Sequence, residues 1–337
     1  MNTENKSPKT LMDAVRYFAD LDVAQDFFVK IRWPHGVCCP HCGSVNVHYL
    51  ANQRRWKCKE KHDRQQFSAK IGTIFEESPL GLDKWIVAVW LETNAKNSIS
   101  SYEVARALGI TQKSAWFMLH RVRHALHTGS FETSMNGVIE ADETFVGGLA
   151  KNMHKAKRDR VITGTGGSNK TAVMGLLARH DGKRKSQVRA TVVPNTNRDT
   201  LHEVIQANVE PGSTLYTDAF QAYRSLGPEY FHDFVNHAEA YVKGAVHTNG
   251  LENFWSLFKR CIKGTHVSVE PFHLGAYVDS EAFRFNNREF DDGQRFLLAM
   301  SKTSGKRLTY KALIGDIASE GRIAADNSAE NATGLSN

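Results

Sequence analysis

Three acidic residues stand in settings from which they could hold divalent metal ions. Asp142 lies within or just after a predicted strand that begins at Val138, and Asp218 ends a second predicted strand. Glu252 falls in the first turn of a predicted helix. Mg²⁺ and Mn²⁺ prefer carboxylate oxygens, and two such ions can activate a nucleophile and stabilise a leaving oxygen in phosphodiester chemistry. Because a single Asp at a strand end is more often a cap or turn residue, the hypothesis depends on all three acids converging.

The predicted helix that carries Glu252 has one polar side. Its polar residues recur at steps of three and four positions: Asn249, Glu252, Ser256 and Lys259. The amide of Asn249 and the carboxylate of Glu252 on one face could serve as metal ligands, and the ammonium group of Lys259 beside them could contact a phosphate. The same spacing also fits an Asn cap followed by surface Glu and Lys residues, so the spacing leaves both interpretations open.

The cysteines point to a second metal. Four of the five fall within 21 positions, at Cys38, Cys39, Cys42 and Cys58, and the fifth is Cys261. Cys39 pairs with Cys42 across two residues, and His62 follows Cys58 after four positions. Two close pairs separated by about 15–20 residues are the spacing of a tetrahedral structural zinc site. The predicted zinc ligands are therefore Cys39, Cys42, Cys58 and His62, and a metal-free hairpin is the alternative.

Residues 83–127 carry the apolar spacing of three helices, and a tight turn joins the last two. Gly109 ends the second helix, and Thr111 can cap the third. The third helix has an apolar stripe at Ala115, Leu119, Val122 and Leu126. Its opposite side is predicted to be basic and exposed, with Lys113, Arg121 and Arg123. This pattern is typical of a helix-turn-helix that binds DNA, although an ordinary helical hairpin has the same spacing.

These candidate sites lie in a chain with five predicted parts. From Gly137 onward, short β-branched runs alternate with helical segments, which predicts a mixed α/β domain. The predicted strands are 138–139, 172–177, 188–193 and 215–216, and the predicted helices are 198–208, 219–225 and 249–263. The predicted domains are a helical segment at 1–34, a zinc ribbon at 35–78, a helix-turn-helix module at 79–128, the α/β domain at 137–300 and an extension at 301–337 with a disordered tail.

The composition favours a polyanionic partner. The chain has 337 residues, 41% of them hydrophobic, and 43 Lys and Arg against 36 Asp and Glu, for a net charge of +7. Five cations precede a Gly-rich stretch and predict a loop that grips a DNA backbone: Lys151, Lys155, Lys157, Arg158 and Arg160. No apolar run approaches the roughly 20 residues of a membrane span, and the first ten residues lack the apolar core of a signal peptide. A cytoplasmic protein without a membrane segment is expected.

Over about residues 12–300 the chain resembles the DDE transposases of bacterial insertion sequences, in the group with an N-terminal zinc ribbon, a helix-turn-helix and a ribonuclease H-like core. The motifs that carry the resemblance are Cys39-Pro40-His41-Cys42, Gln66-Phe67-Ser68, Gly72-Thr73-Ile74-Phe75, Glu140-Ala141-Asp142-Glu143-Thr144, Tyr216-Thr217-Asp218, His247-Thr248-Asn249-Gly250-Leu251-Glu252-Asn253-Phe254-Trp255 with Lys259, and Phe285-Asn286-Asn287-Arg288.

The resemblance implies metal-dependent cleavage of double-stranded DNA at transposon ends, followed by transfer of the freed 3′ hydroxyl to target DNA. It implies Asp142 and Asp218 as the first two catalytic positions, Lys259 as a phosphate contact, a structural Zn²⁺ and a homo-oligomer. Members of the group have Asn or Glu at the third position, and we favour Glu252 over Asn249 because a carboxylate holds a hard cation better. The alternatives are a domesticated DNA-binding regulator with an inactive core and a structure-specific nuclease.

Overall fold

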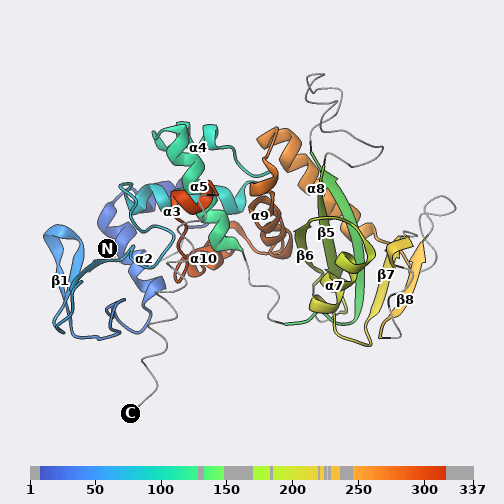
Figure 1. Cartoon of the computed structure of the whole chain (residues 1–337). Helices are drawn as coiled ribbons and strands as arrows, with labels where there is room; N and C mark the ends of the chain where they lie inside the picture. The colour runs from blue at the N-terminus through green and yellow to red at the C-terminus, as the bar shows by residue number, and fades with distance from the viewer. Residues whose placement is uncertain are drawn as a thin grey trace, which may run out of the picture. The chain divides into compact units, whose positions relative to one another are not determined.

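The computed structural model of the chain describes residues 8–127, 133–147, 170–182, 185–218, 221–223, 226, 229–235 and 246–315 (Figure 1). Its internal contacts group the chain into two compact units. Unit 1 comprises Met1–Trp90, Ser101–Ala125 and Phe296–Asn337, and unit 2 comprises Leu91–Ser100 and Leu126–Arg295. The predicted basic loop at 151–160 and the predicted disordered tail lie outside the described residues.

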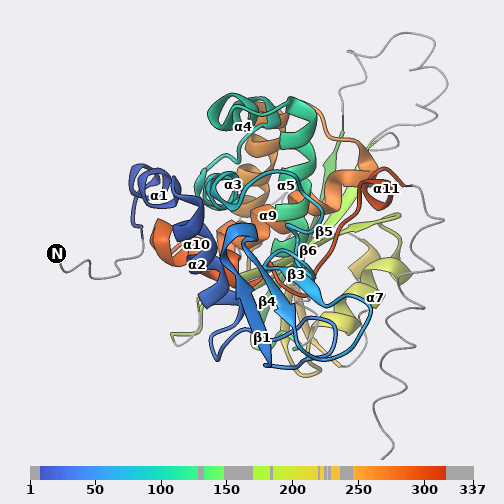
Figure 2. The same cartoon turned by 90° about the vertical axis from the view of Figure 1, so that its left-hand side faces the viewer.

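The N-terminal helical pattern forms two helices, α1 (Leu11–Phe18) and α2 (Leu21–Arg32). Asp20 starts the second, because its carboxylate accepts hydrogen bonds from the backbone amides of Asp22 at 2.7 Å and Val23 at 3.2 Å. The helical segment predicted at 1–34 thus contains two helices, and the second ends at Arg32, just before Pro34. Figure 2 shows both helices beside α10 (Asp292–Ser301), whose Phe296 packs on the rings of Phe18 and Phe27.

A small antiparallel sheet follows, formed by β1 (Val47–Leu50), β2 (Arg55–Cys58) and β3 (Gln66–Ser68). Trp56 and Phe67 are partners across β2 and β3 and are buried together, with ring centres 6.0 Å apart. Because side chains alternate along a strand, Arg55 and Lys57 point to the other, exposed face. One face of the sheet thus has a small apolar core and the other is basic.

The three predicted helices are present as α3 (Leu82–Asn94), α4 (Ser101–Leu108) and α5 (Gln112–Leu126). Gly109 has a φ of +60°, which suits the end of α4, and the Thr111 hydroxyl accepts the Ser114 amide at 3.2 Å. The predicted apolar stripe of α5 is buried at all four positions. A short helix, α11 (Tyr310–Leu313), lies near the end of the described residues.

Unit 2 contains a five-stranded mixed sheet in the order β6-β5-β4-β7-β8. Its strands are β4 (Val138–Val146), β5 (Thr171–Ala178), β6 (Gln187–Val193), β7 (Thr214–Asp218) and β8 (Phe231–Val235). The first three are antiparallel, and β7 and β8 run parallel to β4. This arrangement confirms the predicted ribonuclease H-like fold class. β8 has no counterpart among the predicted strands, because this edge strand has polar residues between exposed phenylalanines and lacks a buried alternating face.

Helices cover both faces of this sheet (Figure 1). On one face, α7 (Arg198–Asn208) packs Leu201 and Ile205 against Ile139 and Leu215. On the other face lie α8 (Asn249–Arg260) and α9 (Leu274–Asn286). The helix predicted at 249–263 ends at Arg260 and continues as a π-helical segment, Cys261–His266. Of the helix predicted at 219–225, the described part is a 3₁₀ turn at Gln221–Tyr223.

Candidate active site and zinc site

The register of the central strands brings Asp142 and Asp218 together. The parallel pairing of β4 with β7 includes the partners Glu140 and Tyr216. Two residues further along each strand lie Asp142 and Asp218, at corresponding positions of neighbouring strands. Because adjacent strands are about 4.8 Å apart, the two carboxylates lie side by side at one place in the sheet.

The electrostatics of the site include the third acid. Burial, and then the negative charge of Asp218, raise the pKa of Asp142 to about 6, and the charge of Glu252 acts in the same direction. The indole Nε1 of Trp255 donates to Asp142 Oδ2 at 3.0 Å and opposes this rise. Three like-charged carboxylates around the half-buried Asp142 fit a divalent cation, which would neutralise the accumulated negative charge.

Helix α8 directs Glu252, Trp255 and Lys259 to the same side, at steps of three and four residues. Burial lowers the pKa of Lys259, and the negative charge of Asp142 opposes that change, which places the ammonium group in the electrostatic field of the acids. Asn249 is exposed at the first position of α8, and no hydrogen bond between described residues joins it to the acids. The structure therefore brings four of the five predicted catalytic residues into one site.

Gly175 makes room for the indole that contacts Asp142. It is the partner of Asp142 across β4 and β5, and a Cβ atom at this position would lie 2.6 Å from Trp255 Cζ2. Such a separation is far below van der Waals contact, so a side chain here would displace Trp255 from the sheet.

Gly175→Ala is therefore expected to destabilise the protein by about 1–3 kcal/mol and to weaken the Trp255–Asp142 hydrogen bond. Urea unfolding, followed by tryptophan fluorescence, measures the loss of stability. Gly275→Ala in α9 is the matched control, because a Cβ there meets no atom within 4 Å. Equal stability of the two variants would contradict the close packing of Trp255 on Gly175.

A fourth carboxylate, Glu143, lies next to the site on the opposite side of β4. It accepts a hydrogen bond from the Tyr223 hydroxyl, and Tyr223 is fully buried in the core on the α7 face. Burial raises the pKa of Glu143 to about 7, although the hydrogen bond from Tyr223 lowers it. Glu143 is not among the predicted site residues, and the one sequence feature that points to it is its place directly after Asp142 in the strand.

The zinc ribbon assembles the predicted ligand set. The ligand atoms of Cys39, Cys42, Cys58 and His62 all lie within 4.8 Å of one another. Cys42 Sγ is 3.7 Å from Cys58 Sγ, and Cys39 Sγ is 3.5 Å from His62 Nε2. A tetrahedral zinc with bonds of about 2.3 Å to sulfur separates two sulfurs by about 3.8 Å. The group therefore fits a structural Zn²⁺.

The local backbone favours the thiolate form at one of these ligands. Burial alone would raise the pKa of the Cys39 thiol, but the backbone amides of His41 and Cys42 donate to its sulfur and bring that pKa below its ordinary value. Gly43, with a φ of +73°, turns the chain immediately after the knuckle. The spacing of Cys39 and Cys42 thus forms a compact knuckle that presents both sulfurs to one point.

Helix α5 does not expose the basic face predicted for it. Arg121 and Arg123 are buried in unit 1, with 4% and 1% of their surface exposed. Arg121 donates to the backbone carbonyl of Glu76, and its guanidinium lies 5.5 Å from the centre of the Trp85 ring. The prediction that these two arginines contact DNA is wrong, because a buried guanidinium cannot reach a phosphate. Lys113, the third predicted cation of this helix, is exposed.

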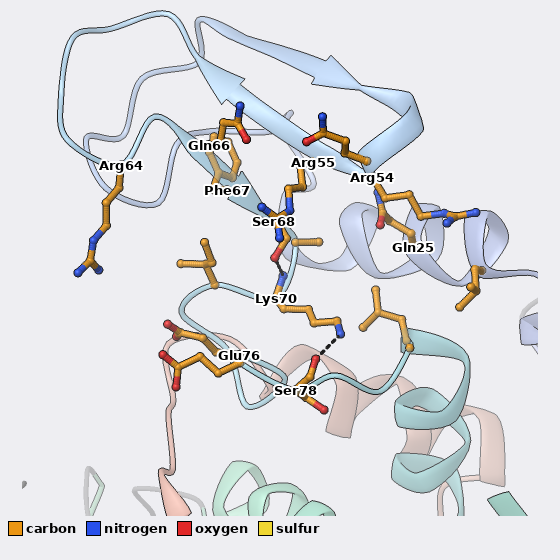
Figure 3. A pocket seen from close by; sticks show the side chains of 17 residues that line it. Gln25, Arg54, Arg55, Arg64, Gln66, Phe67, Ser68, Lys70, Glu76 and Ser78 are labelled. Carbon is orange, nitrogen blue, oxygen red and sulfur yellow. Dashed lines mark hydrogen bonds between the residues drawn. The ribbon is translucent and has the colours of Figure 1, made fainter. Parts of the chain in front are cut away.

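Unit 1 instead has a basic groove on the zinc ribbon. The groove has a volume of about 540 Å³, and Figure 3 shows Arg55 and Ser68 of the ribbon facing Lys70, Glu76 and Ser78. Its cations are Arg54, Arg55, Arg64 and Lys70. Arg54 is paired with Asp22, and the Lys70 ammonium donates to two backbone carbonyls, those of Ser78 and Leu80. Arg55 and Arg64 are exposed, and the structure describes no ion pair for either.

A ribonuclease H-like core joined in one chain to a zinc ribbon is the architecture of an insertion-sequence transposase. Residues 134–286 match the ISXO2-like transposase domain, and residues 21–62 match the transposase zinc-ribbon domain. The chain belongs to this family of transposases.

Two similar proteins support the assignment. A protein in the transposable element ISH50 of Halobacterium salinarum is 27% identical over 293 residues, which cover 83% of this chain and 95% of that protein. A transposase-like protein of Haemophilus influenzae is 34% identical over 122 residues, which cover 36% of this chain and 98% of that protein. No solved structure matches the chain. Among the described residues, no helix combines the length and apolarity that a membrane span requires.

Proposed function

We propose that this transposase binds the ends of its insertion sequence, cleaves DNA strands there and transfers them to target DNA. The observation that carries the proposal is that the charges of Asp218, at the end of β7, and of Glu252, on α8, act on Asp142 in the middle of the neighbouring strand β4. A regulator that only binds DNA has no need of three carboxylates whose charges meet at one site, where burial and the charges of Asp218 and Glu252 raise the pKa of Asp142.

Asp142, Asp218 and Glu252 are the residues that would hold the catalytic Mg²⁺ or Mn²⁺. Bound divalent ions supply activation of the attacking hydroxyl and stabilisation of the leaving oxygen. Trp255 fixes one carboxylate oxygen of Asp142 through its indole N–H. Lys259 lies on the same side of α8, where its ammonium can contact a DNA phosphate. The first step hydrolyses a phosphodiester to leave a 3′ hydroxyl, and that hydroxyl then displaces a 3′ oxygen in target DNA without a covalent enzyme intermediate.

Glu252 is the better candidate for the third position. Its charge contributes to the raised pKa of Asp142, whereas Asn249 is a neutral, exposed residue at the first position of α8. Glu252 also follows the capping residue Thr248, whose carbonyl accepts the Glu252 amide at 3.0 Å. The interaction of its charge with Asp142 therefore supports Glu252 as the third position, and Asn249 is proposed to start the helix.

We further propose that the zinc ribbon provides part of the DNA-binding surface, through the exposed side chains of Arg55, Lys57 and Arg64. Arg55 and Lys57 share the exposed face of β2, and their cross-strand partners are Ser68 and Gln66, which can also donate to phosphate. Lys113 and the five cations at 151–160 stay proposed contacts. The predicted domain boundaries and the homo-oligomer also stay proposals.

Arg55→Ala combined with Arg64→Ala is expected to weaken binding to end-containing DNA by about 10-fold or more at low salt. It should also reduce the slope of log affinity against log salt by about 0.9 for each lost phosphate contact. Fluorescence anisotropy over a range of salt concentrations measures both values. Arg16→Ala, an exposed cation of α1, is the control and should leave the slope unchanged. An unchanged slope in the double variant would contradict a DNA contact by the ribbon.

The test of the proposed function is a cleavage assay on linear DNA that carries the two ends of the element. Addition of Mn²⁺ to the zinc-loaded protein should produce breaks at the junction of the element and its flanking DNA, and mapping of the products should show 3′ hydroxyls there. Breaks at branched or single-stranded DNA without preference for the ends would indicate a structure-specific nuclease. Binding to the ends without cleavage would indicate a regulator.

A further inference from the structure

A buried polar cluster joins β4 to the start of α8. Glu140 has 1% of its side chain exposed, and each of its carboxylate oxygens accepts a hydrogen bond. Arg179 Nε donates to Oε1 at 2.7 Å, and the backbone amide of Leu251 donates to Oε2 at 3.0 Å. The Arg179 guanidinium also donates to the His247 carbonyl at 2.5 Å, and it lies 4.8 Å from the centre of the Tyr216 ring.

This cluster touches every segment that carries a proposed catalytic acid. In each case the member of the cluster precedes the acid by one or two residues: Glu140 before Asp142, Tyr216 before Asp218, and Leu251 before Glu252. Backbone geometry between such close neighbours is nearly rigid within a strand or a helix. A shift of a cluster member would therefore move the acid beside it.

Gly250 allows α8 to begin against Glu140. A Cβ atom on Gly250 would lie 2.8 Å from Glu140 Oε2 and 2.9 Å from Leu177 Cδ1. The carboxylate faces the first turn of the helix, where the backbone amides and the helix dipole favour negative charge. Glu140 thus acts as a cap supplied by the sheet, and it is held in place by Arg179.

We propose that Glu140 and Arg179 are positioning residues, which hold the start of α8 against β4 and β7 so that Glu252 meets Asp142 and Asp218. The inference rests on the proposed function, because it assigns to the cluster the alignment of the proposed metal ligands. A buried ion pair that merely stabilises the fold would have the same contacts. The two roles differ in what happens to the metal site when the pair is broken in a folded protein.

The test measures Mn²⁺ binding to the zinc-loaded, full-length chain by titration calorimetry. Glu140→Gln keeps an oxygen for the Leu251 amide but removes the charge that holds Arg179. It is expected to lower Mn²⁺ affinity by about 10- to 100-fold, which is the usual effect in metalloproteins of removing a residue that holds the metal ligands in place. Gly250→Ala should lower Mn²⁺ affinity similarly, because the added methyl group pushes α8 away from Glu140. This variant keeps every charge in place, and it serves as the test if Glu140→Gln fails to fold.

The matched control is another buried ion pair in unit 2, Glu281 with Arg284, whose side chains lie 2.5 Å apart. Glu281→Gln should lower the melting temperature but change Mn²⁺ affinity less than about twofold. The proposal is overturned if Glu140→Gln and Gly250→Ala both bind Mn²⁺ like the unaltered chain, or if Glu281→Gln loses as much affinity as they do. If Asp142→Asn also retains full affinity, the proposed function itself fails.

Discussion

Asp142→Asn and Asp218→Asn are each expected to lower the rate of strand cleavage at the element's ends by at least about 10³-fold, with little change in DNA affinity. Metal-bound carboxylates contribute several kcal/mol of transition-state stabilisation, and about 4 kcal/mol corresponds to 10³-fold in rate. The amide keeps the shape of the side chain and an acceptor for the Trp255 indole N–H. Single-turnover cleavage and anisotropy on the same DNA separate the two effects.

The stability of these variants distinguishes a catalytic role from a structural one. The folded-state pKa of Asp142, about 6, lies above its ordinary value because of burial and the charge of Asp218. Asp142 therefore stabilises the folded protein while its carboxyl group is protonated, and this contribution is lost as the pH rises through about 6. Without added Mg²⁺ or Mn²⁺, Asp142→Asn should be more stable than the unaltered chain at pH 7 by about 1–3 kcal/mol, and this gain should vanish near pH 4. A less stable variant with lost DNA binding would mean that Asp142 is structural.

The single-turnover cleavage assay also identifies the residue at the third catalytic position. Glu252→Gln should reduce cleavage as strongly as the aspartate substitutions, because it removes a carboxylate from the shared site. Asn249→Ala should affect cleavage by less than about tenfold, through a weaker start of α8. The reverse order of effects would assign the third position to Asn249.

The acids and the zinc ligands could be predicted from sequence because their signals are local. A carboxylate directly after a short apolar run indicates a position in or at the end of a strand, as Asp142 in the middle of β4 and Asp218 at the end of β7 show. Ligand spacing in a knuckle follows from the geometry of a few residues. The convergence of Asp142 with Asp218 needed the strand register, which no local pattern contains. The ribonuclease H-like class followed from the family resemblance, and the alternation of strands and helices agreed with it.

Burial over long sequence distances is what the patterns could not show. Helical spacing identified the apolar stripe of α5 but not that Arg121 and Arg123 are also enclosed, because periodicity tells which residues share a side and not how many sides are covered. The partner of Glu140, Arg179, is 39 positions away in sequence. Neither the hydrogen bond between them nor the capping of α8 by Glu140 has a sequence signature that could have been read without the fold.

Loss of zinc is expected to unfold the ribbon, with a larger effect on binding to the element's ends than on the core. Three strands of three or four residues bury little besides Trp56 and Phe67, so the ribbon has too small an apolar core to fold unaided. A structural zinc contributes about 10–16 kcal/mol of binding free energy to the folding of such a module. Cys39→Ser removes a thiolate from the ligand group and should therefore release the metal and lower affinity for end-containing DNA by at least about tenfold.

Cys38→Ser is the matched control, because Cys38 is the neighbouring thiol and lies outside the group of four ligand atoms. Zinc content measured by mass spectrometry should stay near one per chain in Cys38→Ser and fall well below one in Cys39→Ser. Tryptophan fluorescence should report exposure of Trp56 only in Cys39→Ser, since the ring is buried against Phe67 in the folded ribbon. If Cys39→Ser retains its zinc, or if both variants lose it equally, the assignment of Cys39, Cys42, Cys58 and His62 as the ligands is wrong. If zinc is lost but end binding persists, DNA recognition resides outside the ribbon.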